Sequence, residues 1–236
     1  MSEKRIQTML SGLTSRHIEH EGEVLVIGLG RFGSSLAHTL VDMGYEVLGV
    51  DTNADIVQDH SGTLTHVVQA DTTSERSLRQ IGAADVVTAV VCIGNHVESS
   101  VLTTSALVDL GVRNVWAKAV TAAHGRILER VGAHHVVFPE AEMGSRVAHL
   151  VTGQALEYLP LDDNFVIAEM TAPEELTGVA LGDSNLRAKY KVTVVCVKPQ
   201  GSQFSYADRE TVLNHSDLIV IAGHRADVDR FTDRGR

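Results

Sequence analysis

The sequence predicts an α/β fold: a doubly wound, Rossmann-like parallel sheet, then a crossover helix and a small α+β lobe. Short and almost continuously apolar strands, such as VLVIG and DVVTAVVCIG, alternate with helical patterns from Val24 to Pro139. Such strands are typical of a parallel sheet that is covered on both faces. After residue 158 the pattern changes to short strands and turns, which favours a separate antiparallel lobe.

The chain therefore falls into four parts. Residues 1–21 form a polar lead-in, residues 22–139 the parallel-sheet domain, residues 140–158 a crossover helix or linker, and residues 159–236 the C-terminal lobe. In the linker EAEMGSRVAHLVTGQALEY, the apolar residues recur at helical spacing. We expect this helix to run to about Tyr158.

The elements of the parallel-sheet domain follow in a regular order. Strands are expected at VLVIG, YEVLGVD, THVVQAD, DVVTAVVCIG, NVWAKAV and HHVVFPE, and helices through Leu36 and Leu40 and near residues 54–60, 75–81, 96–110 and 123–131. In the small lobe we expect strands at NFVIAEMTA, KVTVVCVKPQG and SDLIVIAGH, a loop and helix in PEELTGVALGDSNLRAKY, and a closing helix at ADVDRFTDR.

Composition excludes several classes of protein. The 236 residues carry a formal net charge of −10, which argues against an extended basic surface for nucleic acid. Cys92 and Cys196 both lie in apolar runs, as reduced thiols of a cytoplasmic protein do. No apolar run approaches the roughly 20 residues that span a bilayer, and the N-terminus lacks the apolar core of a secretory signal. We expect a cytoplasmic protein that still has the option of docking on a membrane protein.

The most informative motif is GLGRFG, which follows the first strand and precedes an acid at the end of YEVLGVD. This is the dinucleotide-binding fingerprint in its full context. Gly28 makes the tight turn, Gly30 lets a pyrophosphate approach the backbone, and Gly33 lets the helix pack closely on the strand. The helix N-terminus offers N–H groups and partial positive charge to phosphate. Asp51 is placed to accept from a ribose diol and would repel a 2′-phosphate, which favours NAD or ATP over NADP.

The later strand ends supply the second half of the predicted site. In ADTT, Asp71 can accept from an adenine amino group, or it can cap the following helix; both interpretations stay open. The turn Ile93-Gly94-Asn95 ends the fourth strand and would line the same crevice. Besides Gly28, Gly30, Gly33 and Asp51, the cofactor-binding candidates without a positive charge are Phe32, Asp71, Thr72, Ile93, Gly94 and Asn95.

Three charged positions complete the candidate set. Arg31 lies inside the glycine turn, at the positive end of the helix dipole. Its positive charge is unfavourable there unless it contacts an anion. Lys118 follows the fifth strand and either reaches the same region or is simply solvated. Glu140, with Glu142 nearby, either shares a divalent cation such as Mg²⁺ with phosphate or is an ordinary acid at a helix N-terminus. The twelve histidines show no close metal-binding pattern, so we do not expect a structural zinc site.

The sequence favours a nucleotide sensor over an enzyme. A dehydrogenase needs a second domain that brings a substrate anchor and an acid or base to the nicotinamide. The small lobe offers Arg187 but no persuasive catalytic pair, and no serine lies in a GxSxG context. A small NAD-dependent oxidoreductase is the alternative from a different class.

Taken together, these residues identify a resemblance. The chain resembles the RCK-domain (regulator of potassium conductance) family, and most closely its single-RCK, KtrA-type members. The resemblance covers almost everything after Val24, and the combination of motifs is specific. The matching segments are GLGRFG, the VD ending at Asp51, ADTT, WAKA, VGAHHVVFPEAEMGSRVA, NLRAKY and SDLIVIAGHRADVDRF.

The resemblance implies a cytoplasmic ring built from dimers, an octamer, docked under a KtrB- or TrkH-like membrane subunit that translocates potassium. In such proteins ATP activates and ADP relaxes, and Arg31 matches the arginine that meets the terminal phosphate from an adjacent subunit. Glu140 matches the glutamate at the intersubunit nucleotide site, where a cation can bridge. Some relatives bind cyclic di-AMP at the C-lobe, near the position of Arg187. An NAD(H)-responsive, Trk-type regulator is the runner-up.

Overall fold

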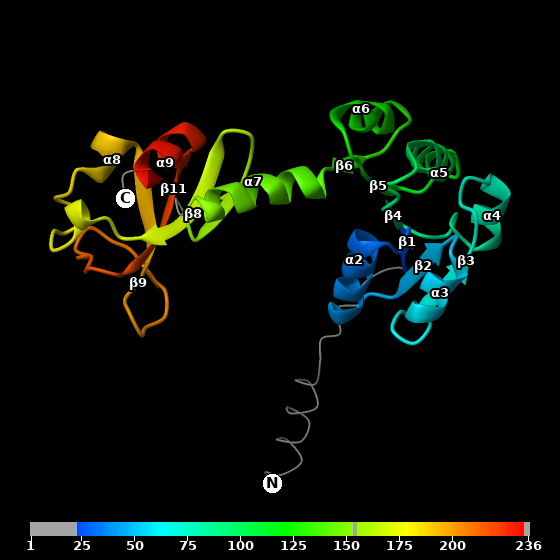
Figure 1. Ribbon diagram of the computed structural model, residues 1–236, viewed down its shortest axis with the longest axis horizontal. Coiled ribbons are helices and arrows are strands. Elements are labelled where there is room, and N and C mark those ends of the chain that lie inside the picture. Colours follow the sequence, from blue (N-terminus) through cyan, green and yellow to red (C-terminus); the bar gives the residue numbers. More distant parts are fainter. Residues whose placement is uncertain (1–22, 153–154, 234–236) are drawn as a thin grey trace, which may run out of the picture. The chain divides into compact units, whose positions relative to one another are not determined.

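The chain divides into two compact units, each with its own sheet and its own core (Figure 1). The computed structural model describes residues 23–152 and 155–233. The first unit ends at Pro139 and the second begins at Glu140.

The described part of the first unit is a parallel sheet whose strand order, β3-β2-β1-β4-β5-β6, reverses beside β1. All neighbouring strands in this sheet run parallel. An open sheet of this order binds ligands at the carboxyl ends of its strands, where the order reverses. The elements are β1 (Val24–Ile27), α2 (Arg31–Asp42), β2 (Val47–Asp51), α3 (Ala54–His60), β3 (His66–Gln69), α4 (Glu75–Gln80), β4 (Thr88–Val91), α5 (Val97–Asp109), β5 (Asn114–Lys118), α6 (Ala122–Arg130) and β6 (His135–Val137).

Helices cover both faces of this sheet. Leu78 of α4, Leu107 of α5 and Leu128 of α6 pack in one cluster with Leu25 and other strand residues. On the opposite face Ala37 of α2 packs with alternate residues of the same strands. Every residue of β1 is buried, as the central strand of such a sheet requires. The predicted doubly wound parallel sheet is confirmed.

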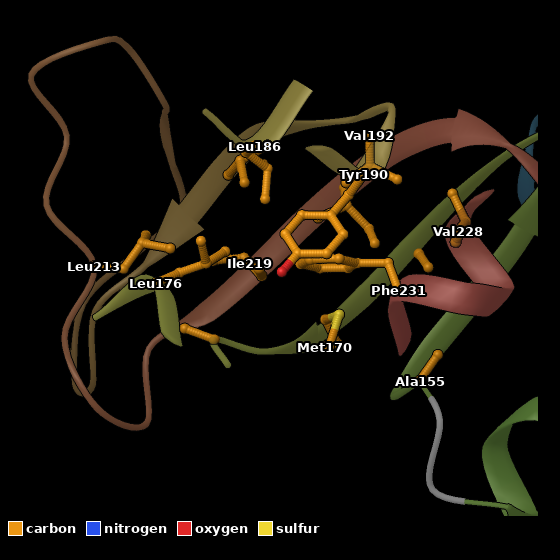
Figure 2. Packing of buried hydrophobic residues seen from close by; sticks show 14 of the residues in the cluster. Ala155, Met170, Leu176, Leu186, Tyr190, Val192, Leu213, Ile219, Val228 and Phe231 are labelled. Atoms are coloured by element: carbon orange, nitrogen blue, oxygen red, sulfur yellow. The ribbon is translucent and has the colours of Figure 1, made fainter. Parts of the chain in front are cut away.

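The second unit is an antiparallel sheet with the strand order β10-β9-β11-β8-β7. Figure 2 shows its core, in which Tyr190 of α8 meets Phe231 of α9 edge-on, with ring centroids 5.2 Å apart. Met170 lies below the two rings in this view, and Ile219 lies beside them. The predicted α+β lobe is confirmed, and its strands pair within the chain. Its elements are α7 (Pro139–Val151), which begins at the boundary, β7 (Glu157–Pro160), β8 (Phe165–Thr171), the 3₁₀ turn η1 (Glu174–Leu176), α8 (Leu186–Tyr190), β9 (Val192–Lys198), β10 (Ser205–Tyr206), β11 (Leu218–His224) and α9 (Arg225–Thr232).

The linker helix predicted over 140–158 is wrong at its C-terminal end. Helix α7 ends at Val151, and the residues from Glu157 onward form strand β7 instead. The N–H of Leu156 donates to the carbonyl of Glu169 at 2.7 Å, and Tyr158, which is 2% exposed, pairs opposite β8. Backbone pairing with β8 and burial of the tyrosine ring stabilise an extended chain here, although the apolar spacing alone also suits a helix.

Candidate nucleotide-binding site

Two glycines shape the turn between β1 and α2. Gly28 has a φ of +89°, in the left-handed region that favours glycine. A Cβ on Gly28 would lie 3.2 Å from the backbone nitrogen of Ile93, so the turns that follow β1 and β4 lie against each other. A Cβ on Gly33 would lie 1.9 Å from the carbonyl oxygen of Gly28. Glycine at position 33 is therefore what allows α2 to start so close to β1.

The N-terminus of α2 presents an open donor surface. Gly30 is the exposed N-cap residue, and a Cβ there would meet nothing within 4 Å. In the part of the chain that the structure describes, this helix has neither a side-chain cap nor an acidic residue in its first turn. Its leading N–H groups and partial positive charge therefore suit an anion, and exposed Arg31 adds a full charge. This donor set fits a phosphate group.

Asp51 ends β2 beside the same turn. Its Oδ2 accepts from the N–H of Leu29 at 2.8 Å, and its Oδ1 accepts from the N–H of Asn53 at 2.9 Å. These two backbone bonds hold the carboxylate against the glycine turn. Because a carboxylate has about four acceptor positions, Asp51 keeps capacity for a ribose diol.

Lys118, at the end of β5, reaches this edge of the sheet. Its Nζ lies 5.5 Å from the ring centroid of Phe32, and a Cβ on Gly94 would be 3.4 Å from that nitrogen. Lys118 is only 8% exposed, so the solvated alternative is wrong. Residues from three distant segments thus lie together, and a buried ammonium adds to the preference for an anion.

Cys92 lies beneath the turn, and its thiol is inert. Its Cβ is 3.1 Å from where a Cβ on Gly33 would be. Burial raises the pKa of Cys92 to about 12, although the charge of Lys118 acts in the opposite direction. The thiol therefore stays protonated at neutral pH and is no nucleophile. Both Cys92 and Cys196 are free thiols.

Asp71 lies exposed beyond the end of β3, and it does not cap α4. Its Oδ1 accepts from the hydroxyl of Thr73 at 2.7 Å and from the Thr73 N–H at 3.0 Å, and these bonds lower the pKa of Asp71. The cap of α4 is Ser74, whose hydroxyl accepts from the N–H of Ser77. The capping interpretation of Asp71 is therefore wrong, and the exposed carboxylate stays a candidate for the adenine.

Thr72 and Asn95 differ in what they leave for a ligand. Thr72 is 3% exposed, and its hydroxyl pairs with that of Thr103 on α5 at 3.0 Å. This hydrogen bond engages the buried Thr72 side chain. Thr72 would therefore contact a ligand through its backbone. Asn95 is exposed in the turn that follows Gly94.

Glu140 and Glu142 occupy the first turn of α7, where acids suit the helix dipole. They belong to the second unit, whereas the glycine turn belongs to the first, so the geometry above stands without them. Among the described residues, no group of three or more His, Cys, Asp or Glu side chains could hold a metal ion. In the small lobe, exposed Arg187 donates to the hydroxyl of Thr193 at 3.2 Å.

Sequence reasoning missed two residues that fix the turn. Leu29 is 2% exposed and accepts at its carbonyl, at 2.6 Å, from the hydroxyl of Ser34, which also lies 2.7 Å from Nε2 of His60. Leu29 is a variable position of the motif, and Ser34 lies just beyond its last glycine. No sequence signal separates Ser34 from its neighbour Ser35, because only the fold brings the end of α3 beside it.

Comparisons with known proteins match both the parallel-sheet domain and nearly the whole chain. Residues 24–139 match the TrkA-N domain family model. The chain is 36% identical, over 211 residues, to the Ktr system potassium uptake protein A of Bacillus subtilis (strain 168), and the match covers 89% of this chain and 95% of that protein. The chain belongs to the Ktr potassium uptake protein family. The Ktr-family protein A of Vibrio alginolyticus is 34% identical over 199 residues, covering 84% of this chain and 90% of that protein.

Solved structures show the fold of this Ktr-family chain. The crystal structure of the GsuK RCK domain matches with a TM-score of 0.62 and 20% identity, over 92% of this chain and 48% of that one. The GsuK channel bound to NAD matches with a TM-score of 0.62 and 18% identity, over 99% of this chain and 44% of that one. The chain thus spans about half the length of these solved chains. The resemblance to RCK-domain, KtrA-type proteins is confirmed.

Proposed function

We propose that this protein is the nucleotide-sensing regulatory subunit of a potassium uptake system, and that it binds its nucleotide without chemical turnover. The observation that carries the proposal is the uncapped N-terminus of α2, flanked by the Asp51 carboxylate and the buried Lys118 ammonium. Relatives that match nearly the whole chain are named potassium uptake proteins. Their names support potassium uptake as the process that the nucleotide controls.

ATP and ADP differ in the terminal phosphate, so a sensor of their ratio must recognise that group. The N–H groups of α2 hold the inner phosphates, and Arg31 of an adjacent subunit meets the terminal one. ATP then stabilises one conformation of the assembly, and ADP, which lacks this contact, releases it. Allosteric coupling of this kind typically amounts to about 1–3 kcal/mol per site, and equivalent sites in one assembly multiply it.

Calorimetric titration of nucleotide-free protein with ATP, ADP and NADH, with and without Mg²⁺, tests the proposal. We expect ATP and ADP to bind, and Arg31→Glu to remove the difference between them without loss of the fold. Arg76→Glu, which reverses another exposed arginine on α4, is the matched control and should leave that difference intact. Equal affinities for ATP and ADP in the wild type would contradict the ATP-sensing mechanism.

Two alternatives are outcomes of the same titration. Asp51 also accommodates NAD(H), and binding of NADH alone would identify a redox-responsive, Trk-type regulator. Turnover in a hydride-transfer assay would instead identify an oxidoreductase.

The partner and the assembly extend the proposal. Within the described ranges, no helix is both long enough and apolar enough to cross a bilayer. We propose a cytoplasmic octameric ring that associates with the membrane through a KtrB- or TrkH-like potassium-translocating subunit, with no nucleic-acid partner. Light scattering of the purified protein measures the number of subunits in the ring. Co-purification with the membrane subunit tests the association.

Two further ligands belong to this proposal. Glu140 binds Mg²⁺ or another cation at the intersubunit nucleotide site, because carboxylate and phosphate oxygens together suit such an ion. Glu140→Gln should then weaken the effect of Mg²⁺ on ATP affinity. Cyclic di-AMP binds the small lobe near Arg187, and a titration with that dinucleotide, repeated on Arg187→Ala, tests this.

A further inference from the structure

Leu29, at the centre of the glycine turn, is held at its side chain and at both of its peptide groups. Its Cδ1 packs over Gly49 of β2, where a Cβ would be only 3.1 Å away. Its N–H donates to Asp51 at 2.8 Å, and its carbonyl accepts from Ser34 at 2.6 Å. The dinucleotide-binding fingerprint includes Asp51. It does not include Ser34, whose hydroxyl holds the Leu29 carbonyl.

The hydrogen bonds of Ser34 determine which atom of His60 carries a proton. A carbonyl oxygen can only accept, so the single hydroxyl hydrogen of Ser34 goes to Leu29. The same oxygen lies 2.7 Å from Nε2 of His60, the last residue of α3. With its hydrogen already donated, Ser34 can only accept there. His60 is therefore protonated at Nε2 and donates to Ser34.

This relay fixes a phosphate-binding group. The carbonyl of Leu29 and the N–H of Gly30 belong to one planar peptide unit, so holding the carbonyl sets the direction of that N–H. Gly30 is the exposed N-cap of α2, with open space around its Cα. Asp51 fixes the preceding peptide plane through the N–H of Leu29. Two successive peptide planes of the turn are thus held before any ligand binds.

We propose that His60, acting through Ser34, is a positioning residue of the nucleotide site that pre-orients the Gly30 N–H toward phosphate. The proposal rests on the nucleotide-binding function proposed above. Pre-orientation strengthens binding because the turn does not have to be ordered when the ligand arrives. Loss of the relay therefore weakens ATP and ADP alike, since both carry the inner phosphates.

The test compares four single variants and one double variant by calorimetric titration with ATP and ADP. Ser34→Ala and His60→Phe should each weaken the binding of ATP and of ADP about tenfold, which corresponds to the loss of one hydrogen bond. The double variant should be no weaker than the weaker single, because both changes break one relay. His60→Gln should stay within about twofold of the wild type, since its amide N–H also donates.

His38→Phe is the matched control. The His38 ring lies 5.3 Å from that of His60 at an angle of 59°, so it packs against His60 at the same α2–α3 contact. We expect wild-type affinity from this variant. The inference is overturned if His60→Phe binds like His38→Phe, or if His60→Gln is as weak as His60→Phe.

Amide hydrogen exchange of residues 28–34 in nucleotide-free protein separates this inference from the proposed function. Faster exchange at Leu29, whose N–H is a hydrogen-bonded amide of the turn, in Ser34→Ala and His60→Phe, but not in His60→Gln or His38→Phe, supports the relay. Unchanged exchange in all variants overturns it. Wild-type protein that binds none of ATP, ADP or NADH would refute the proposed function, while the exchange data would still decide whether His60 holds the turn. Thermal unfolding of every variant confirms that the fold is intact.

Discussion

At the scale of single residues, the three glycines of one motif have different physical tasks. Gly28 requires a positive φ, Gly33 requires the absence of a Cβ, and Gly30 requires neither, because its surroundings are open. The stability of the fold therefore depends on Gly28 and Gly33, whereas the missing side chain of Gly30 leaves room for a ligand. This separation predicts opposite phenotypes for two identical substitutions.

Gly33→Ala should destabilise the protein by ~2 kcal/mol or more, because overpacked positions typically cost about 1–3 kcal/mol and the clash here is with backbone. Gly30→Ala should change stability by less than about 1 kcal/mol, since alanine fits its φ of −67°. The same methyl group should nevertheless weaken nucleotide binding. Urea unfolding and calorimetric titration of both variants measure this. Unimpaired binding by Gly30→Ala would argue against a phosphate at this turn.

A second residue-scale prediction concerns acid stability. His124 is 2% exposed, its Nδ1 accepts from the N–H of Val120 at 3.4 Å, and within the described residues its Nε2 has no partner. Burial lowers the pKa of His124 below its ordinary 6.5. As the pH falls below about 6.5, the unfolded chain therefore binds a proton before the folded chain does, and the free energy of unfolding decreases.

Urea unfolding between pH 7.5 and pH 5 measures this effect. His124→Gln should flatten the decrease in unfolding free energy over that window, whereas His66→Gln, at an exposed histidine of β3, should not change its slope. An unchanged slope in His124→Gln would mean that other groups set the acid sensitivity.

At the scale of elements, the segment between α7 and β8 shows how tertiary contacts override a local pattern. The ring of His149 on α7 stacks on that of Tyr158 on β7, with centroids 3.7 Å apart and planes within 9°. Arg146 of α7 pairs with Glu157 of β7, and the hydroxyl of Tyr158 donates to Asp229 of α9 at 3.0 Å. Burial, and then the hydrogen bond to Asp229 and its negative charge, raise the pKa of Tyr158 to about 12, although the charge of Arg225 acts in the opposite direction. Tyr158 thus joins three elements of the second unit.

Removing parts of this junction should have graded effects. Tyr158→Ala should cost about 3–5 kcal/mol through lost burial of a large ring, and Tyr158→Phe about 1 kcal/mol through the lost hydrogen bond. Glu157→Gln should cost less than about 1 kcal/mol, because exposed ion pairs contribute little. Chemical denaturation, followed by a probe in the second unit, ranks the three variants. Similar losses for Tyr158→Phe and Tyr158→Ala would contradict a packing role for the ring.

At the scale of the whole molecule, α7 carries an apolar stripe that residues 23–152 and 155–233 leave exposed. Met143, Val147 and Val151 are 53%, 42% and 79% exposed and recur every fourth residue along one side of the helix. Exposed apolar surface of this kind marks a protein contact. We expect a second copy of the chain to cover it in the proposed ring.

Val147→Asp should therefore reduce the assembly to smaller species, because a carboxylate would be buried in the contact without a partner. Ser145→Asp, two residues earlier and on another side of the helix, should leave the assembly mass unchanged. Size-exclusion chromatography with light scattering measures both. An unaltered mass for Val147→Asp would place the contact between copies elsewhere.

The fold class, both lobes and the glycine turn with Asp51 beside it followed from the sequence because their signals are local. A strand, a glycine turn and a helix are contiguous in VLVIGLGRFG, and Asp51 follows at the next strand end. Steric limits on φ and the missing Cβ then fix the turn whatever surrounds it. The resemblance to RCK-domain, KtrA-type proteins followed from these segments in combination with ADTT, WAKA, VGAHHVVFPEAEMGSRVA, NLRAKY and SDLIVIAGHRADVDRF, which are also local signals.

Only the tertiary structure decided the contacts that depend on which strands become neighbours. Pairing of β4 with β5 buries Lys118 beside Phe32, and packing of α3 on α2 brings His60 to Ser34, which is 26 residues away in the chain. Pairing with β8 turns the end of a helical pattern into β7. In each case the local pattern allows two states, and burial or hydrogen bonding with a distant segment supplies the free energy that selects one.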